Sequence, residues 1–182
     1  GRDVNVNASD LKGESVAIEA ERDVNFGVVS SGAIRHYTNG NQLDDKEFSG
    51  SSVNSLGDLL LSAGNNINSN AVSYSANKDF YANAGSDLNL NSAHALRNNK
   101  VFEYEWHNTA LKANAITAGE NLTLIAGQDI TSQAAVMTAG SQAGMQAGRD
   151  INLLAEETRK GKSLKTRGLT KIDEQVRQQG TG

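Results

Sequence analysis

A short motif that recurs along the chain constrains its fold more than any other feature of the sequence. The motif reads apolar-x-apolar-x-Ala-Gly-x-Asp/Asn-apolar. Clear copies lie at residues 59–67, 80–90, 122–130 and 145–153. A degenerate copy at residues 16–26 has Glu21 in place of the glycine. Repetition of one short unit is typical of a solenoid, in which each turn packs mainly on its two neighbours.

The acidic or amide residue of the motif sets the length of the repeat. It occurs at positions 3, 23, 66, 87, 129 and 150, so neighbouring copies are 20, 43, 21, 42 and 21 residues apart. We interpret these intervals as one or two turns of a coil of about 21 residues. Apolar residues such as Leu122 and Leu124 alternate within each copy, which predicts strands rather than helices.

Stacked strands of this length predict a right-handed parallel β-helix, because a short strand can bury its apolar face only between similar neighbours. The hand follows the strong bias of parallel β crossovers. We expect the corner glycines to supply a positive φ, and the Asp or Asn that follows to bond nearby backbone groups or to stack in ladders. Aromatic residues make up only 5% of the chain, so a thin core of Val, Ile, Leu and Ala is predicted.

A longer period lies on top of the coil. Asp23, Asp87 and Asp150 recur at an interval of about 63 residues, which is three lengths of the coil repeat. After each of them the coil pattern gives way to a more charged segment, and we expect these segments to be hairpins that leave the β-helix at one angular position every third turn. They are predicted near residues 30–55, 93–114 and 156–177, with turns at 38–41, 97–100 and 159–162. The whole chain, residues 1–182, is expected to form a single domain of about six coils.

Residues 147–158 (AGRDINLLAEET), followed by a segment rich in Lys, Arg and Ser, resemble the haemagglutinin repeat of the filamentous haemagglutinin family. Residues 1–6, 127–131 and 176–181 resemble the same unit, so the resemblance extends over the whole chain. The family comprises very long exoproteins that Gram-negative bacteria secrete by a two-partner pathway. It includes adhesins and contact-dependent growth-inhibition exoproteins, which carry a toxin at the C-terminus. The resemblance implies that this chain is a structural segment of the shaft of such a cell-surface protein.

The two ends of the chain lead to the same expectation. The chain begins in mid-repeat and stops close to where a next coil would start, so we expect a fragment of a longer protein without the secretion domain or a toxin domain. For that parent, the resemblance implies an outer-membrane transporter as secretion partner, and a glycan or receptor on a host or target cell. No apolar run is long enough to span a bilayer, and a net charge of −4 gives no general attraction to nucleic acid.

Residues suited to catalysis or metal binding are sparse in this sequence. The histidines, His36, His94 and His107, lie in or beside the predicted hairpins without ligand spacing, and neither cysteine nor a catalytic motif is present. We therefore expect no enzymatic activity, no cofactor and no metal site. The alternative is a polysaccharide-binding or polysaccharide-cleaving β-helix, which needs Asp, Arg or Lys side chains that converge on one face of adjacent coils.

An aromatic patch lies in the second predicted hairpin. Strand alternation places Phe102, Tyr104 and Trp106 on one face and the intervening polar residues on the other. We expect the aromatic face to lie flat against the coils, because apolar patches on soluble proteins are normally covered. The alternative is an exposed platform for sugar rings or for a partner strand.

A basic patch lies in the third predicted hairpin. It consists of Arg159, Lys160, Lys162, Lys165, Arg167 and Lys171. We expect a solvated edge whose charges discourage pairing with other strands. The alternative is a contact for an anionic glycan or a receptor.

Overall fold

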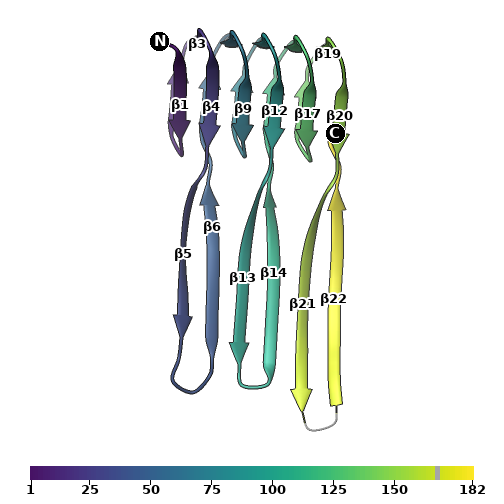
Figure 1. The fold of residues 1–182 in the computed structure, drawn as a ribbon. Helices are drawn as coiled ribbons and strands as arrows, with labels where there is room; N and C mark the ends of the chain where they lie inside the picture. Colours follow the sequence, from purple (N-terminus) through teal and green to yellow (C-terminus); the bar gives the residue numbers. More distant parts are fainter. Residues whose placement is uncertain (167–168) are drawn as a thin grey trace.

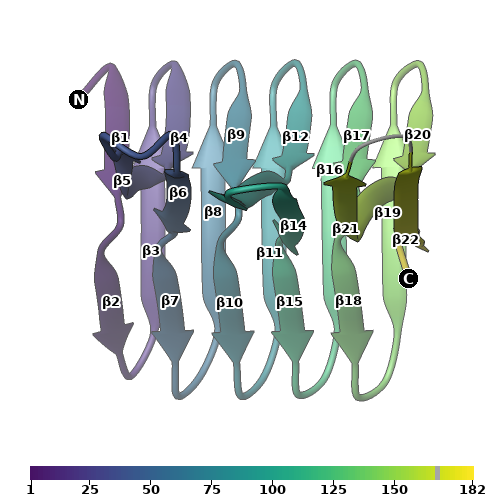
Figure 2. The ribbon, with the colours of Figure 1, turned by 90° about the horizontal axis from the view of Figure 1, so that it is seen from below.

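Four sheets make up the part of the chain that the computed structural model describes, residues 1–166 and 169–182, and these residues form no helix. Three parallel sheets are the walls of a β-helix, and a fourth, antiparallel sheet projects from it (Figure 1 and Figure 2). The predicted all-β fold, a parallel β-helix with hairpin excursions, is confirmed.

Each wall is built from short strands that recur once per coil. The first wall contains β1 (Asp3–Asn7), β4 (Asp23–Gly27), β9 (Ile67–Asn70), β12 (Leu88–Asn91), β17 (Ile130–Gln133) and β20 (Ile151–Leu154). The second wall contains β2 (Asp10–Gly13), β7 (Ser52–Ser55), β10 (Ser73–Ala76), β15 (Ala115–Ala118) and β18 (Val136–Ala139). The third wall contains β3 (Val16–Ala20), β8 (Leu59–Ala63), β11 (Phe80–Ala84), β16 (Leu122–Ala126) and β19 (Ala143–Ala147). The hairpin sheet contains β5 (Val29–His36), β6 (Gln42–Ser49), β13 (Ala93–Val101), β14 (Tyr104–Lys112), β21 (Glu156–Thr166) and β22 (Leu169–Gln179).

Neighbouring coils pair in register along each wall. In the third wall, Phe80 of β11 lies opposite Leu59 of β8 on one side and Leu122 of β16 on the other. Equivalent residues therefore stack above one another, at the spacing of about 4.8 Å that separates hydrogen-bonded strands.

The hairpins leave the β-helix at every second coil, which corrects the predicted spacing of every third. β4, β12 and β20 each run into a hairpin, whereas β1, β9 and β17 turn directly into the second wall. The two longer intervals between motif copies, from Asp23 to Asn66 and from Asp87 to Asp129, thus contain one coil and one hairpin, not two coils. The reason is geometric. A hairpin is two strands wide, about 9.6 Å, which equals the rise of two coils, so hairpins from alternate coils fill one continuous sheet.

Coils with and without a hairpin make the same corner in different ways. In the coils without one, two residues join the first wall to the second, and the first of them is an alanine in the left-handed region. These alanines, Ala8, Ala71 and Ala134, have φ angles of 43°, 52° and 51°. In the alternate coils an entire hairpin takes the place of this alanine. Because this corner tolerates either the alanine or a whole hairpin at the same point, the hairpins all leave the β-helix at one angular position.

The core is a single column between the three walls. It consists largely of Val, Ile, Leu and Ala, as predicted. It also contains three aromatic rings, which the predicted core did not include. Phe26, Tyr74 and Phe80 meet edge to face, with centroid distances of 5.5 and 5.4 Å. The hydroxyl groups of Tyr74 and Ser69 lie 2.8 Å apart. The Ser69 hydroxyl donates a hydrogen bond of 2.7 Å to the buried side-chain amide oxygen of Asn114. Burial raises the pKa of Tyr74.

The corner glycines allow close stacking of the coils and do not supply the predicted positive φ. Among the described glycines only Gly40, in the first hairpin turn, has a positive φ. At Gly85 a Cβ atom would overlap the carbonyl oxygen of Gly64 in the preceding coil, and Gly127 stands in the same relation to Gly85. Glycine is needed here because the backbones of successive corners touch.

Polar ladders run along the outside of the first wall, as the motif predicts. The corner carboxylate of Asp87 accepts a hydrogen bond from the backbone N–H of Asp129 in the next coil, at 3.2 Å. Two residues further along each strand, side-chain amides donate to the amide oxygens of the neighbouring coil at 2.9–3.0 Å. This ladder comprises Asn5, Asn25, Asn68 and Asn89.

Two of the three predicted hairpin turns lie elsewhere. The first turn, between β5 and β6, lies at residues 37–41, close to the predicted 38–41. Residues 97–100 lie inside β13, and the second turn is the pair 102–103 instead. Residues 159–162 lie inside β21, and residues 52–55, predicted within the first excursion, form β7 of the second wall. Asn, Lys and Gly are tolerated in mid-strand because both faces of a hairpin strand are exposed, so composition alone does not mark a turn.

A candidate interaction surface on the hairpin sheet

The three hairpins form one sheet that stands clear of the coils. Its strand order is β5-β6-β13-β14-β21-β22, so each hairpin pairs with the next through β6–β13 and β14–β21 (Figure 1). In the first seam Asp45 pairs with Arg97, and in the second seam Asn108 pairs with Lys160. Each residue of the second pair lies 63 residues after its counterpart in the first pair, which is the long period of the sequence. The second seam therefore repeats the geometry of the first. The sheet is a single layer, and its described strands pack mainly against one another (Figure 2).

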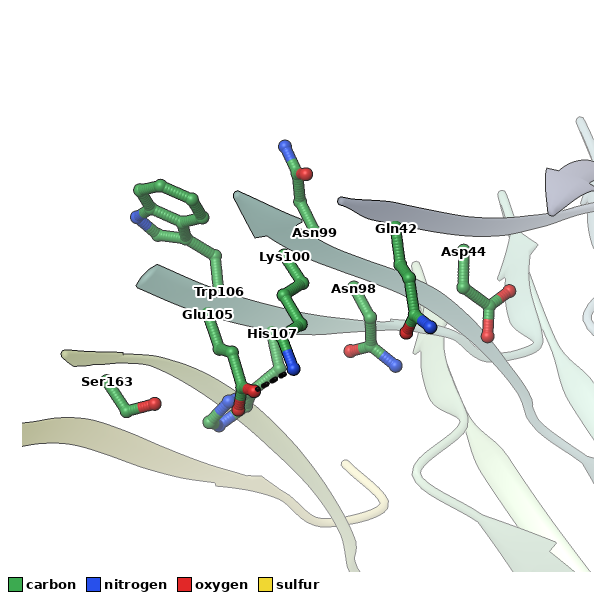
Figure 3. Close-up of a pocket in the computed structure, with 9 residues that line it drawn as sticks. All are labelled: Gln42, Asp44, Asn98, Asn99, Lys100, Glu105, Trp106, His107 and Ser163. Atoms are coloured by element: carbon green, nitrogen blue, oxygen red, sulfur yellow. Dashed lines mark ion pairs between the residues drawn. The ribbon is translucent and has the colours of Figure 1, made fainter. Parts of the chain in front are cut away.

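Strand alternation gives this sheet two chemically different faces. We call the face that carries Trp106 the aromatic face and the face that carries His107 the histidine face. Figure 3 shows Trp106 and Asn99 pointing to one side of the sheet, and Lys100, Glu105 and His107 to the other. Because residues directly opposite in antiparallel strands share a face, the register extends this assignment to β21 and β22.

The aromatic residues are exposed, so the expectation that they pack against the coils is wrong. Tyr104 and Trp106 lie on the aromatic face with nearly parallel rings, 5.8 Å between centroids and 16° between planes. They are 49% and 40% exposed. Phe102 does not share their strand, because it lies in the turn with a φ of 53°, and it is 68% exposed. Alternation identifies a two-faced strand but does not show whether another layer covers it.

The basic residues of the third hairpin do not form one surface. The aromatic face carries Lys160, Lys162 and Lys171, the histidine face carries Arg159 and Lys165, and Arg167 lies outside the described residues. Residues that are adjacent in a strand point to opposite sides, so a cluster in the sequence becomes two smaller groups in the sheet. One of these groups shares its face with Tyr104 and Trp106.

Ion pairs connect side chains on both faces of the sheet, within a strand and between strands. On the histidine face, the Arg159 guanidinium lies 3.3 Å from Glu157 and 3.9 Å from Glu174. On the aromatic face, Lys162 Nζ lies 3.7 Å from Asp173. The pKa of Glu157 is lowered, first by a hydrogen bond from Gln178 and then by Arg159. All these groups are exposed, so each pair adds little to stability.

A polar hollow of about 330 Å³ lies on the sheet where β6, β13, β14 and β21 meet (Figure 3). It is lined by Gln42, Asp44, Asn98, Asn99, Lys100, Glu105, Trp106, His107 and Ser163. Lys100 and Glu105 form an ion pair of 3.3 Å, and His107 lies 3.8 Å from Glu174. Gly161 makes room for His107, because a Cβ atom there would overlap the imidazole ring.

This hollow can hydrogen-bond polar groups of a ligand, since it offers amides, carboxylates and cations together. In residues 1–166 and 169–182, no three His, Asp or Glu side chains are grouped so that they could hold a metal ion. The same residues include no helix that is long and apolar enough to cross a membrane.

The sequence analysis missed residues that complete the aromatic face. They are Asn108 of β14, Leu164 of β21, and Asp173 and Gln175 of β22. They lie beside the predicted lysines only through cross-strand pairing, which has no local signature in the sequence. The long period of the sequence could have revealed them in part. Once the residue pairs of one seam are known, adding this period to both strands gives the residue pairs of the next seam.

Comparison with known proteins agrees with this architecture. The hemagglutinin-repeat family matches residues 98–171, which cover the end of β13, all of β14, the coil strands β15 to β20, and the third hairpin as far as the start of β22. The chain is 36% identical over 127 residues to a tRNA nuclease CdiA of Escherichia coli strain STEC_O31, covering 70% of this chain and 4% of that protein. It is 41% identical over 56 residues to the tRNA nuclease CdiA of E. coli strains 536 and NC101, covering 31% of this chain and 2% of each. No solved structure matches.

The chain thus spans at most 4% of the length of these curated relatives. Proteins of this kind are substrates of two-partner secretion that are exposed on the surface of Gram-negative bacteria. The repeated coils of the structure and the two sequence matches all indicate the same family. The chain belongs to the haemagglutinin-repeat region of the filamentous haemagglutinin and contact-dependent growth-inhibition exoprotein family.

Proposed function

We propose that this chain is a segment of the shaft of a secreted filamentous exoprotein, and that the shaft supports adhesion to target cells or delivery of a toxin into them. The observation that carries the proposal is the in-register parallel pairing of every coil with its neighbours. Such pairing makes length proportional to the number of repeats, because each added coil extends all three walls by one strand.

The dimensions support a shaft. One superrepeat contains two coils and one hairpin, so it lengthens the rod by about 9.6 Å. Its hairpin adds two strands to the hairpin sheet, which keeps that sheet continuous along the rod. For the parent protein we infer the partners that the family implies, an outer-membrane transporter during secretion and a glycan or receptor on the target cell.

A length measurement tests the shaft. Inserting a second copy of residues 67–129 after Asp129 should lengthen the folded chain by about 10 Å in small-angle scattering, with one more hairpin in the sheet. Inserting a second copy of residues 67–87 after Asp87 is the control. It should add about 4.8 Å to the column but leave a one-strand gap between the first and second hairpins. An insertion of the whole superrepeat that leaves the long dimension unchanged would contradict the shaft.

We infer that the segment acts structurally and not as an enzyme. The matched region in both comparisons is the repeat itself. The competing function, cleavage of a polysaccharide by a β-helix, is tested by incubating the purified chain with acidic and neutral polysaccharides. Release of new reducing ends above the blank would overturn the structural role.

A further inference from the structure

The last three strands of the hairpin sheet arrange side chains on the aromatic face as a regular grid. Across β14, β21 and β22 the rows are Tyr104, Leu164 and Lys171, then Trp106, Lys162 and Asp173, then Asn108, Lys160 and Gln175. Directly opposite positions in antiparallel strands are close enough for their side chains to interact. The grid is therefore one continuous surface in which two aromatic rings border three lysines.

The lysines in this grid do not serve to protect a free strand edge. Charged residues on an edge strand discourage pairing with other chains. Lys160 and Lys162, however, lie on β21, which is hydrogen-bonded to β14 on one side and to β22 on the other. The solvated-edge interpretation thus fails for two of the three lysines, and their position needs another explanation.

The grid is locally positive on an acidic chain. The net charge of the whole chain is −4, yet this surface holds three lysines against the single carboxylate of Asp173. Lys162 lies 3.7 Å from that carboxylate. Within the described part of the chain, neither Lys160 nor Lys171 is within ion-pair distance of an acidic side chain. Local fields of this kind attract an anionic ligand whatever the overall charge.

The shape of the surface limits what can occupy it. A shallow hollow of about 240 Å³ lies beside Trp106, between Lys160, Lys162, Asp173 and Gln175. That volume is below the roughly 300–1,000 Å³ typical of pockets that enclose a whole drug-sized ligand. The hollow therefore suits one unit of a longer polymer, with the remainder lying across the open sheet.

We propose that the aromatic face of β14, β21 and β22 binds an acidic polysaccharide. The apolar face of one sugar ring packs on the exposed indole of Trp106. A carboxylate or sulfate of the polymer pairs with Lys160 and Lys171. Ring hydroxyls bond the amides of Asn108 and Gln175, which offer both donors and acceptors.

Retention on immobilised polymers tests this proposal with the 182-residue chain. Heparin supplies sulfate, polygalacturonate supplies carboxylate, and dextran is the neutral control. The chain should bind one or both acidic polymers at low salt and not dextran. Elution is expected as the salt approaches ~0.5 M, where exposed charges are screened within a few Å.

Matched variants locate the site. Lys160→Ser with Lys162→Ser should weaken binding about tenfold. Arg159→Ser with Lys165→Ser removes the same charge from the same strand but from the histidine face, and should change affinity by less than about threefold. Trp106→Ala should also lose about tenfold, and Trp106→Phe should keep most of the binding. The melting temperature of each variant, measured in parallel, separates lost binding from lost folding.

Three results would overturn the proposal. One is a chain that neither acidic polymer retains at low salt. Another is an equal loss in the two double variants, which would mean that charge acts without regard to face. The third is preferential binding to anionic phosphatidylglycerol vesicles with a blue shift of Trp106 emission, which would assign the face to a membrane surface. A hairpin sheet that binds nothing would still extend the rod, so this proposal and the shaft fail independently.

Discussion

The β-helix column and the hairpin sheet share the same backbone pairing but are held together by different forces. Column residues such as Phe26, Leu61 and Leu88 are at most 1% exposed. In the hairpin sheet Ile34 and Ile172 remain 70% and 66% exposed, because that sheet has no interior. Conversely, eight of the eleven ion pairs among the described residues lie within the hairpin sheet. Apolar burial stabilises the column, whereas polar side chains cover the hairpins.

This difference shows which region supports the other. A single-layer sheet without a buried apolar face is not expected to be stable alone in water. Here the column supplies the missing constraint, because it holds the root of each hairpin two coil rises from the next. The hairpin sheet in turn offers a large polar surface at little cost to the core. Substitutions should therefore affect stability mainly in the column and binding mainly in the sheet.

The largest effect is expected from a charge placed in the column. Leu124 is 1% exposed and lies opposite Ala82 and Met145 in the neighbouring coils. Leu124→Asp buries an unpaired carboxylate and should cost about 4 kcal/mol or more of unfolding free energy. Thr123→Asp, one residue away and facing outward, should cost less than about 1 kcal/mol. Denaturant unfolding of the two variants gives the comparison, and equal costs would mean that the faces of β16 are misassigned.

A smaller but still large effect is expected at the corners. Gly85→Ala forces a methyl group against the carbonyl oxygen of Gly64, so it should destabilise by about 1–3 kcal/mol. Gly144→Ala is the matched control in the same column, because a Cβ atom there meets nothing within 4 Å. Thermal melts of both variants distinguish close packing from a general intolerance of the column to substitution. A loss at Gly144 as great as that at Gly85 would refute the stacking role of the corner glycines.

The sequence predicted the column better than the sheet, for a physical reason. The coils repeat because each strand packs on an equivalent strand, so Leu59, Phe80 and Leu122 occupy equivalent positions in the motif. The hairpin sheet depends on pairing between strands that are distant in the sequence; Trp106, for example, lies opposite Lys162. A local sequence pattern does not reveal such pairing. The corner glycines were correctly located but wrongly explained, because a one-dimensional sequence does not show which backbones touch between coils.

Excision of a hairpin should have a modest effect on the column. Replacing residues 92–113 by one alanine gives the junction Asn91-Ala-Asn114, which imitates the corner around Ala71. Because the column core does not include this hairpin, the melting temperature should change by no more than about 4 °C, or ~1 kcal/mol for a chain of this size. The first and third hairpins should lose their bridge and become accessible to protease. A chain that no longer folds would mean that the sheet holds the column together.

The smallest effect is expected at an exposed corner of the column. Arg149 Nε and Nη2 lie 3.1 and 2.6 Å from the two carboxylate oxygens of Asp129, and this hydrogen-bonded pair lowers the pKa of Asp129 below its ordinary 3.8. A carboxyl whose pKa is depressed in the folded state contributes stability above its unfolded pKa and loses it as the pH falls through the folded value. Arg149→Gln should therefore lower the melting temperature slightly at pH 7, and the gap from the parent chain should close as the pH falls below about 3.8. Because both groups are exposed, added salt should also narrow the gap. A gap that stays constant from pH 7 to pH 2 would show that Arg149 acts through packing of its side chain instead of through its charge.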